Sequence, residues 1–437
     1  MRNPLFALAI ISLAACAGGT SSNSSSPTPM AYDFSLPHKA EESLFEGTSL
    51  LSSREEFVKA LDYLAFHEVK QKVKFAFSND YRASFYNPYQ EFLAALKATD
   101  IAESLPVVCD TDPLDAEGYI AIRMSHPKDY GTHASDPDGR IALVRKGYEP
   151  QNRMHALPIF SKGLPEVEVE TSDQLYHALS SGYLPKPKES SRAELLFEKL
   201  CDICYKQVNE DATDLIRAYS LYRYMSDEVR YDFSIAYTSD TYLYPESAYY
   251  LDGPLLHNLA VCDGIAKTNV CLLRMEGFEA VRATGRNGNG DDHAWAYLKM
   301  DEKWYTSCPT YGRLNSISIG GSTYAIGGYH MFLASKETPY KEKWGYVPNG
   351  SSGIYDSLEE SAYPLPYSSD PTSPFWKVDE AGLESLGEEA SKLNPKEAKE
   401  FVTEPSLSEE SLLNEVGDKA YLIPIKDDTP HYLLVKI

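Results

Sequence analysis

Positive charge is scarce in this sequence. Its 437 residues contain 41 Lys and Arg against 64 Asp and Glu, which gives a formal net charge of −23. Because phosphate binding needs a basic face, this balance argues against nucleic acid as a main partner. It equally disfavours electrostatic adhesion to an anionic membrane, and it favours neutral or basic polypeptides as partners.

The sequence also has few cysteines and no internal repeat. Seven cysteines are too few for a disulfide scaffold of this length. After residue 15, no apolar segment reaches the length of a membrane span. Hydrophobic residues nevertheless make up 43% of the chain and aromatic residues 12%. This composition predicts folded cores, and the length predicts two or three domains.

The first residues have the pattern of a secretion signal. Arg2 precedes an apolar segment, 5–15, that is too short to span a bilayer. Cys16 directly follows small residues, which resembles a bacterial lipobox, where the Cys is lipid-modified and becomes the new N-terminus. The alternative is ordinary secretion with an incidental Cys. The Ser- and Pro-rich residues that follow indicate a flexible tether. We predict a lipid-anchored, extracytoplasmic protein with a signal peptide at 1–15 and a tether at 16–38.

Residues 39–185 predict an α+β domain without a motif for chemistry. A capping box, Ser53 with Glu56, begins a helix at Arg54. Periodicity predicts the other elements. They are a strand at 73–77, a helix at 89–98, and strands at 119–122 and 141–144. The Pro- and Lys-rich residues 184–190 predict a linker to the next domain.

Two amphipathic helices follow this predicted linker. Ser191 and Glu194 form a second capping box that begins one helix, and another spans 214–229. Cys201 and Cys204 lie inside the first helix, without a second pair or a nearby His, so no zinc site is predicted. The C-terminal extension, 341–437, has a helix at 408–416 and strands at 420–425 and 432–437. The two strands form either a hairpin added to a sheet or a small β module.

A cysteine stands at the start of a predicted helix. Cys262 precedes a pattern in which Ala266, Val270 and Leu273 share one face, and Gly277 ends the helix. The N-terminus of a helix lowers the pKa of a thiol and favours a thiolate nucleophile. The alternative is a buried structural thiol, since free cysteines are often buried.

A histidine begins a strand further along the chain. Residues 293–298 alternate as a strand, and 304–308 form its hairpin partner. A two-residue turn at Asp301-Glu302 would set Trp295 opposite Cys308. His293 and Cys308 then lie on one face as diagonal neighbours. A lone His is usually exposed or satisfied, but its order after a helix-start Cys indicates thiol catalysis.

Together these segments resemble the transglutaminase-like superfamily, and most closely its bacterial extracytoplasmic branch, which is related to cysteine proteases. The resemblance covers about 195–340 and lies in the motifs Val261-Cys262-Asp263-Gly264-Ile265-Ala266, His293-Ala294-Trp295 and Trp304-Tyr305-Thr306-Ser307-Cys308-Pro309-Thr310, with Val229-Arg230-Tyr231-Asp232 upstream and 329–335 downstream. It implies an α+β, papain/transglutaminase-like core in 190–340. In this core a helix-borne Cys packs on an antiparallel sheet that carries the His.

The resemblance also implies roles for the residues. Cys262 would attack a glutamine carboxamide or a peptide bond, and His293 would take the thiol proton and return it to the leaving amine. Water or an amine would then resolve the thioester. The Cys262 N–H is the expected oxyanion donor, with Tyr249 or Tyr250 as a candidate second donor. A peptide or protein substrate is implied, and no metal or cofactor.

Cys308 departs from the family pattern, which has an Asp at this position. A carboxylate orients the imidazole and stabilises the imidazolium, and a neutral thiol does neither well. A slow Cys262–His293 dyad, helped by Asp291 or Asp292, is one interpretation. A degraded enzyme that only binds a polypeptide or cell-wall partner is another. In the third, Cys308 pairs oxidatively with another thiol. We therefore hold two hypotheses, a transglutaminase-like cysteine enzyme and a non-enzymatic binding protein.

Overall fold

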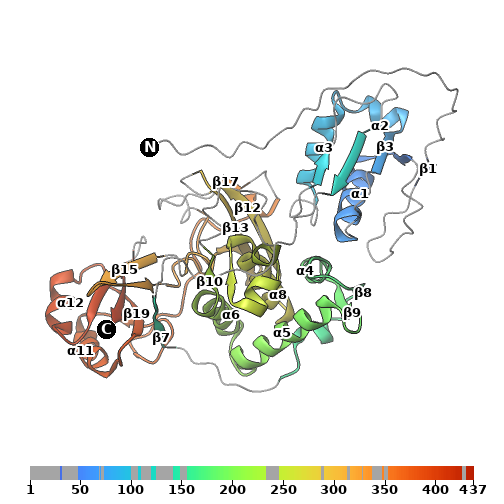
Figure 1. Ribbon diagram of the computed structural model, residues 1–437. Coiled ribbons are helices and arrows are strands. Elements are labelled where there is room, and N and C mark those ends of the chain that lie inside the picture. The colour runs from blue at the N-terminus through green and yellow to red at the C-terminus, as the bar shows by residue number, and fades with distance from the viewer. Residues whose placement is uncertain are drawn as a thin grey trace.

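A computed structural model provides the fold of the chain (Figure 1). It describes residues 30–31, 48–67, 69, 73–99, 107–109, 120–124, 141–147, 155–232, 246–286, 290–312, 315–326, 328–336, 347–348, 353–425 and 430–437. The predicted signal peptide and Cys16 lie outside these residues. Within the described segments, none of the helices is long and apolar enough to cross a bilayer.

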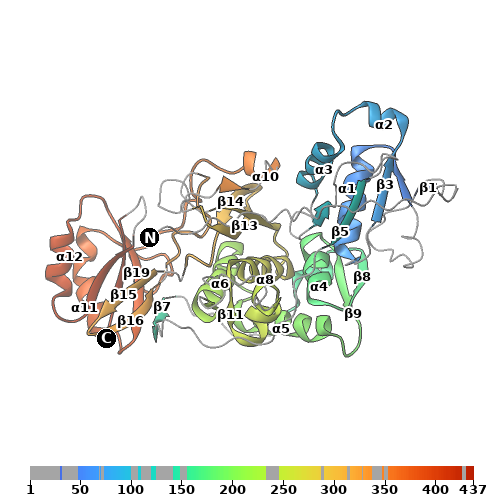
Figure 2. The ribbon, with the colours of Figure 1, turned by 45° about the horizontal axis from the view of Figure 1, so that its top comes forward.

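The N-terminal part contains a five-stranded sheet with helices packed beside it (Figure 2). Its strand order is β1-β2-β3-β5-β4. The core is aromatic, since the ring of Phe57 lies 5.8 Å from that of Phe75 and 6.3 Å from that of Phe92. The predicted helices and the strand at 73–77 are confirmed. The elements are β1 (Met30–Ala31), β2 (Thr48–Leu51), α1 (Arg54–Phe66), β3 (Val73–Phe77), α2 (Asn79–Ala83), α3 (Pro88–Lys97), β4 (Val107–Cys109) and β5 (Ile120–Met124).

Both predicted capping boxes begin helices, with one difference from the expected pattern. Ser53 Oγ accepts the Glu56 N–H at 3.2 Å, and Ser191 Oγ accepts the Glu194 N–H at 3.1 Å. Each glutamate, however, accepts the N–H of the residue before the cap, Ser52 or Ser190, at 2.6 Å. The reciprocal bonds therefore satisfy the entering chain as well as the helix end.

The prediction of a linker at 184–190 is wrong. Residues Leu184–Pro187 form strand β9, which pairs in parallel with β8 (Glu166–Val169), and α4 (Ser172–Ser180) connects the two strands. The two prolines of β9 occupy alternate positions, between residues whose backbone N–H groups form hydrogen bonds with β8 and its flanking residues. The Leu184 N–H donates to the Pro165 carbonyl, and the Lys188 N–H donates to the Val169 carbonyl, both at 2.9 Å. Proline at the non-donating positions is therefore compatible with a strand.

The central part places helix α8 (Cys262–Met275) against a four-stranded sheet with the order β14-β13-β12-β17 (Figure 1). Helices α4, α5 and α6 also contact α8, and its Val270, Leu272 and Leu273 are fully buried. This arrangement fits the predicted α+β, papain/transglutaminase-like core. The remaining elements here are α5 (Arg192–Gln207), α6 (Asp214–Glu228), β10 (Arg230–Tyr231), η5 (Glu246–Tyr249), η6 (Gly253–His257), β11 (Leu259–Ala260), β12 (Ala280–Arg286), β13 (Asp292–Met300), β14 (Lys303–Ser307) and β17 (Val347–Pro348).

The hairpin that joins β13 to β14 has the predicted register. Asp301 and Glu302 have φ angles of +48° and +64°, as a two-residue type I′ turn requires. Met300 pairs with Lys303, and the ladder continues to Ala296 opposite Ser307. One further step places Trp295 opposite Cys308, so His293 lies diagonally across from Cys308.

The C-terminal part is a sheet with the order β18-β19-β21-β20, covered by α11 and α12. The predicted helix and both strands are confirmed, and the strands form a hairpin that lies beside β19. The predicted strand at 141–144 is instead two short strands in different sheets: β6 pairs with β16 and β7 pairs with β19. The elements are β6 (Ile141–Ala142), β7 (Val144–Lys146), β15 (Asn315–Ile319), β16 (Ser322–Ile326), β18 (Lys377–Val378), α11 (Leu383–Lys392), β19 (Glu397–Thr403), α12 (Glu409–Val416), β20 (Tyr421–Ile425) and β21 (His431–Val435).

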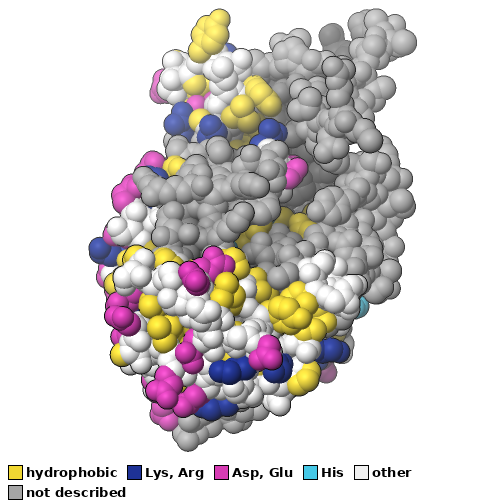
Figure 3. Space-filling view, turned by 90° about the vertical axis from the view of Figure 1, so that its left-hand side faces the viewer, with side chains coloured by type: hydrophobic (Ala, Val, Ile, Leu, Met, Phe, Trp, Pro, Cys, Tyr) yellow, Lys and Arg dark blue, Asp and Glu magenta, His cyan; other side chains and the backbone are white. Residues whose placement is uncertain are grey.

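The side chains on the outer face of this C-terminal part are mixed. Figure 3 shows acidic groups distributed among hydrophobic ones rather than gathered in one patch. Leu413 of α12 and Tyr421 of β20 are among the exposed hydrophobic residues. Isolated apolar side chains of this kind are normal on protein surfaces and indicate no particular partner.

Candidate active site

Cys262 is the first residue of helix α8, as predicted. The N-cap residue is Val261, whose side chain cannot accept a hydrogen bond, and it has an extended backbone. Gly264 lets another segment cross the first turn closely, because a Cβ at this position would lie 2.5 Å from the Ala248 carbonyl oxygen. The helix start is thereby held against residues 248–250, and the Val261 N–H donates to Ala248 O at 3.1 Å.

Two buried cations hold the residue after Cys262. Asp263 forms ion pairs with Arg282 of β12 and with Lys267, whose Nζ lies 3.3 Å from the carboxylate. The Lys267 Nζ also donates to the Tyr249 carbonyl at 3.1 Å and lies 4.2 Å from the centre of the Tyr250 ring. The Tyr249 carbonyl and the Tyr250 ring thus contact Lys267.

A different tyrosine contacts the sulfur of Cys262. The Tyr231 hydroxyl of β10 donates to this sulfur, and the backbone N–H of Ala294 donates to it as well. Cys262, Ala266 and Ala294 form a small apolar cluster with Tyr231 packed against it. Because Ala294 directly follows His293 on β13, this contact brings the start of α8 to the histidine.

His293 and Cys308 lie together as the hairpin register predicts. The distance from His293 Nε2 to Cys308 Sγ is 3.4 Å, within the range for a hydrogen bond to sulfur. Asp291 and Asp292 are exposed, and Asp292 lies 3.7 Å from Arg286 of β12. Of Asp291, Asp292 and Cys308, the three residues considered as partners of this imidazole, it is therefore the Cys308 thiol that contacts Nε2.

Burial keeps both candidate catalytic groups neutral. It raises the pKa of the Cys262 thiol to about 12; the nearby Asp263 adds to this rise, and the Ala294 N–H and Tyr231 oppose it. Burial also lowers the pKa of His293 to about 3. Of the two interpretations of Cys262, burial favours the neutral thiol at rest, because desolvation exceeds the effect expected of the helix N-terminus. The exposed fractions are 9% for Cys262 and 6% for His293.

Aromatic rings form the wall around His293. Trp295 stacks on the imidazole with ring centres 5.8 Å apart, and the Tyr311 ring lies at 5.0 Å. The sequence reasoning assigned no role to Tyr311 or to Tyr231. Tyr231 stands in the Tyr-Asp ending of a recognisable motif, which is the signal that could have identified it. Tyr311 follows Cys308 in a turn without any distinctive pattern.

The segment predicted to follow the site in the family pattern packs beside β14. The Cys308 N–H donates to the Met331 carbonyl at 2.9 Å, and Thr306 and Ala334 exchange backbone hydrogen bonds at 3.0 and 2.8 Å. Residues 331–334 thereby extend the pairing at the end of β14 and fix the backbone of Cys308.

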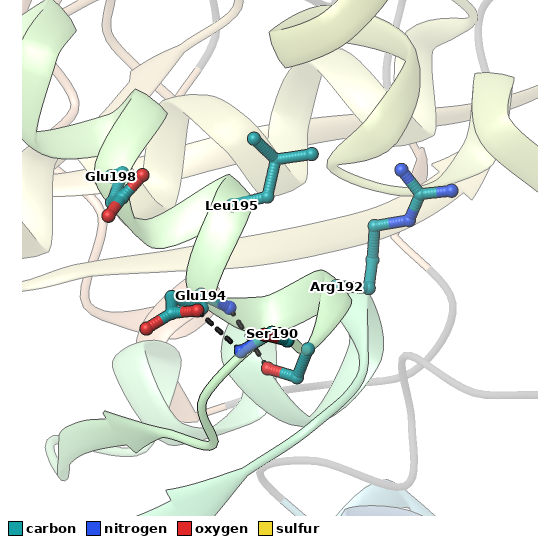
Figure 4. Close-up of a pocket in the computed structure, with 6 residues that line it drawn as sticks. Ser190, Arg192, Glu194, Leu195 and Glu198 are labelled. Carbon is teal, nitrogen blue, oxygen red and sulfur yellow. Dashed lines mark hydrogen bonds between the residues drawn. The ribbon is translucent and has the colours of Figure 1, made fainter.

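A surface hollow at the start of α5 is separate from these residues (Figure 4). Its lining includes Ser190, Ser191 and Glu194, whose polar groups are engaged in the capping bonds described above. Arg192 at its edge lies 3.2 Å from Asp252. This hollow therefore offers no set of polar groups aimed at a ligand.

Comparison with known proteins agrees with the family expected for this site. Residues 202–307 match the model of the transglutaminase-like superfamily. No curated protein matches the chain. Similar solved structures include a TGase (22% identity, 30% of this chain and 35% of that chain, TM-score 0.23). They also include the periplasmic domain of TgpA from Pseudomonas aeruginosa (18%, 31% and 46%, TM-score 0.21).

A third structure, described as a candidate cysteine protease from Cytophaga hutchinsonii, is 11% identical over 51% of this chain and 66% of that chain, with a TM-score of 0.21. The chain spans about a third of the length of the TGase and less than half of the TgpA domain. The matched segment begins in α5 and ends with β14, and so contains both Cys262 and His293. This segment is the part of the chain that matches the transglutaminase-like superfamily.

Proposed function

We propose that this protein is a lipid-anchored, extracytoplasmic cysteine enzyme that attacks amide bonds of peptides or proteins. One arrangement supports this proposal above all. The thiol of Cys262 at the start of α8 accepts a hydrogen bond from the N–H of Ala294, the residue next to His293, and Cys308 Sγ lies 3.4 Å from His293 Nε2. A thiol, a base and a third group on paired elements are what nucleophilic acyl transfer requires.

The first step forms a bond between the Cys262 sulfur and the carbonyl carbon of the amide. His293 Nε2 faces Cys308, so Nδ1 is the nitrogen that takes the thiol proton. The oxygen of the tetrahedral intermediate would accept from the Cys262 N–H and from the Tyr231 hydroxyl. Tyr231 replaces Tyr249 and Tyr250 as our candidate for the second donor, because it already contacts the sulfur.

The second step breaks the carbon–nitrogen bond of the amide. The leaving amine takes the proton from His293, and a thioester on Cys262 remains. Water then hydrolyses this thioester, or a second amine is acylated. Both outcomes regenerate the thiol, and the residues around Cys262 favour neither of them.

The lipid anchor in this proposal depends on the sequence alone. Cys16 follows an apolar leader and small residues, and a Ser- and Pro-rich segment comes next. Metabolic labelling with an alkyne fatty acid tests it: the wild-type protein should incorporate the label, and Cys16→Ala should not. Equal labelling of both would contradict the anchor.

A second candidate function is a binding protein that has lost catalysis. The burial of Cys262 and His293 and the thiol at the family's Asp position favour it. In that case the surface over Cys262 would hold a polypeptide or cell-wall partner without cleaving it.

Covalent labelling distinguishes the two functions. We expect iodoacetamide at pH 7.5 to alkylate Cys262, because His293 can accept the thiol proton during attack, as read by peptide mass spectrometry. Labelling at this position should be absent in Cys262→Ser and fall at least about tenfold in His293→Ala. Cys201→Ser is the matched control, since Cys201 is a partly exposed thiol on α5. An unchanged rate in His293→Ala would contradict the catalytic dyad.

A further inference from the structure

A buried arginine joins the C-terminal sheet to the central part. Arg145 lies on β7, which pairs with β19, and only 4% of its side chain is exposed. Its guanidinium forms an ion pair with Asp227 of α6 and lies 3.5 Å from Glu400 of β19. One of its nitrogens also donates to Ser226 Oγ at 2.9 Å. Three elements far apart in the sequence therefore meet at this side chain.

The two carboxylates around Arg145 are themselves fixed by other groups. Glu400 accepts the Tyr329 N–H at 2.7 Å and lies 2.7 Å from His431 Nε2. Burial works against its charge, but His431 and Arg145 hold its pKa below the usual range. Arg145 and Arg223 do the same for the pKa of Asp227 against its burial. The buried positive and negative groups thus compensate one another. Removal of Arg145 would leave the carboxylates of Asp227 and Glu400 without this cation.

Arg145 also reaches the turn that follows Cys308. The same nitrogen that bonds Ser226 donates to the Gly312 carbonyl at 3.2 Å. Gly312 packs tightly on α6, because a Cβ there would lie 2.7 Å from Ser226 Cβ and 3.1 Å from the Tyr222 hydroxyl. The preceding residue, Tyr311, has its ring 5.0 Å from His293.

We propose that Arg145 is a positioning residue for the candidate active site. It fastens the turn 309–312 to α6 and to the C-terminal sheet, and this turn holds Cys308 and Tyr311 against the imidazole of His293. The C-terminal part is then a component of the site rather than an appended module. This inference rests on the proposed function, since its effect is read at Cys262 and His293.

The neighbouring residue on the same strand provides a matched control. Lys146 lies 3.2 Å from Glu397, also across the β7–β19 pair, but its side chain is 37% exposed. It makes an ion pair between the same two strands. Exposed pairs of this kind contribute little to stability. A loss specific to Arg145 therefore reports its contacts with Gly312 and the carboxylates and not the strand pairing.

The test uses the full chain and the rate of Cys262 alkylation. Arg145→Lys keeps the charge but loses the planar fork, so it should slow alkylation at least about tenfold while Lys146→Met leaves the rate unchanged. In the His293→Ala background, Arg145→Lys should cause no further loss, because its effect passes through the histidine. An equal loss in that background would show a general structural effect and overturn the proposal.

A second variant keeps the test decisive if Arg145→Lys does not fold. Glu400→Gln retains an oxygen for the Tyr329 N–H but removes one charge from Arg145, and the same dependence on His293 is expected. Unchanged alkylation in a folded Arg145→Lys or Glu400→Gln protein would overturn the inference alone. An unchanged rate in His293→Ala would instead overturn the proposed function.

Discussion

A buried thiol and a buried imidazole share a site in which neither carries charge at neutral pH. The pKa of Cys262 is raised to about 12 and that of His293 is lowered to about 3, both chiefly by burial. A preformed thiolate–imidazolium pair is therefore not the resting state. The proton must move from sulfur to nitrogen during attack, and the group beside His293 Nε2 affects how favourable that transfer is.

A carboxylate at position 308 should assist this transfer. In Cys308→Asp, a negative charge near His293 Nε2 would raise the imidazole pKa and stabilise the imidazolium. We expect the alkylation of Cys262 to accelerate at least about tenfold, as measured by mass spectrometry of samples quenched at timed intervals. Cys308→Ser is the control, since it changes size and polarity without adding charge. Equal rates in the Asp and Ser variants would show that position 308 does not orient the histidine.

The neutral state of His293 also predicts acid sensitivity. Its pKa is about 3 in the folded protein and about 6.5 in the unfolded chain. The unfolded state therefore takes up the proton first as pH falls below about 6.5, and folding stability decreases from there towards pH 3. We expect wild type to lose about 2 kcal/mol more than His293→Gln between pH 7 and pH 5, from urea unfolding.

His257→Gln provides the control for that measurement, because His257 is exposed. It should lose the same stability as the wild type between the two pH values. An identical loss in His293→Gln would mean that His293 is not held neutral by burial.

Helix α8 depends on one close crossing at its start. Residues 248–250 lie across its first turn, and Gly264 is what allows this approach. The three residues of this motif contribute differently. Cys262 provides the sulfur of the site, and Asp263 provides the carboxylate that pairs with Arg282 and Lys267. Gly264 has no side chain and so leaves room for residues 248–250. The motif is explained by these contacts, each of which involves a different part of the chain.

A methyl group at Gly264 should displace this crossing. In Gly264→Ala the new Cβ would lie 2.5 Å from the Ala248 carbonyl, and we expect a loss of about 1–3 kcal/mol in the free energy of unfolding. Gly353→Ala is the matched control, because it lies in a helix where a Cβ meets nothing within 4 Å. Equal stabilities of the two variants in urea unfolding would contradict the close contact at Gly264.

Local sequence patterns predicted most helices and strands, but they did not predict contacts between residues far apart in the sequence. The register that joins His293 to Cys308 followed from a two-residue turn and strand alternation, both of which are read within 16 residues of sequence. Tyr231 reaches Cys262 from a separate strand, and no spacing rule relates the two. The sequence left open whether Cys262 is a thiolate or a buried thiol, because desolvation depends on the packing of the whole domain and not on the helix start.

One hydrophobic core extends through the N-terminal and central parts of the molecule. A continuous cluster includes Phe57 of α1, Leu175 of α4, Leu196 of α5 and Leu272 of α8. The predicted division at about residue 190 stays a prediction, but these contacts show that the two parts pack on each other. The sequence could not indicate this, because amphipathic helices show which face is buried and not which neighbour covers it.

The pairing of β7 with β19 sets the order in which the chain can finish folding. Val144 of β7 lies opposite Glu397, so the first of the two strands leaves the ribosome long before its partner exists. Until β19 is made, Arg145 has Asp227 as a partner but not Glu400. If Arg145 positions His293, the Cys262 thiol reaches its full reactivity only after the last strands of the chain have been made.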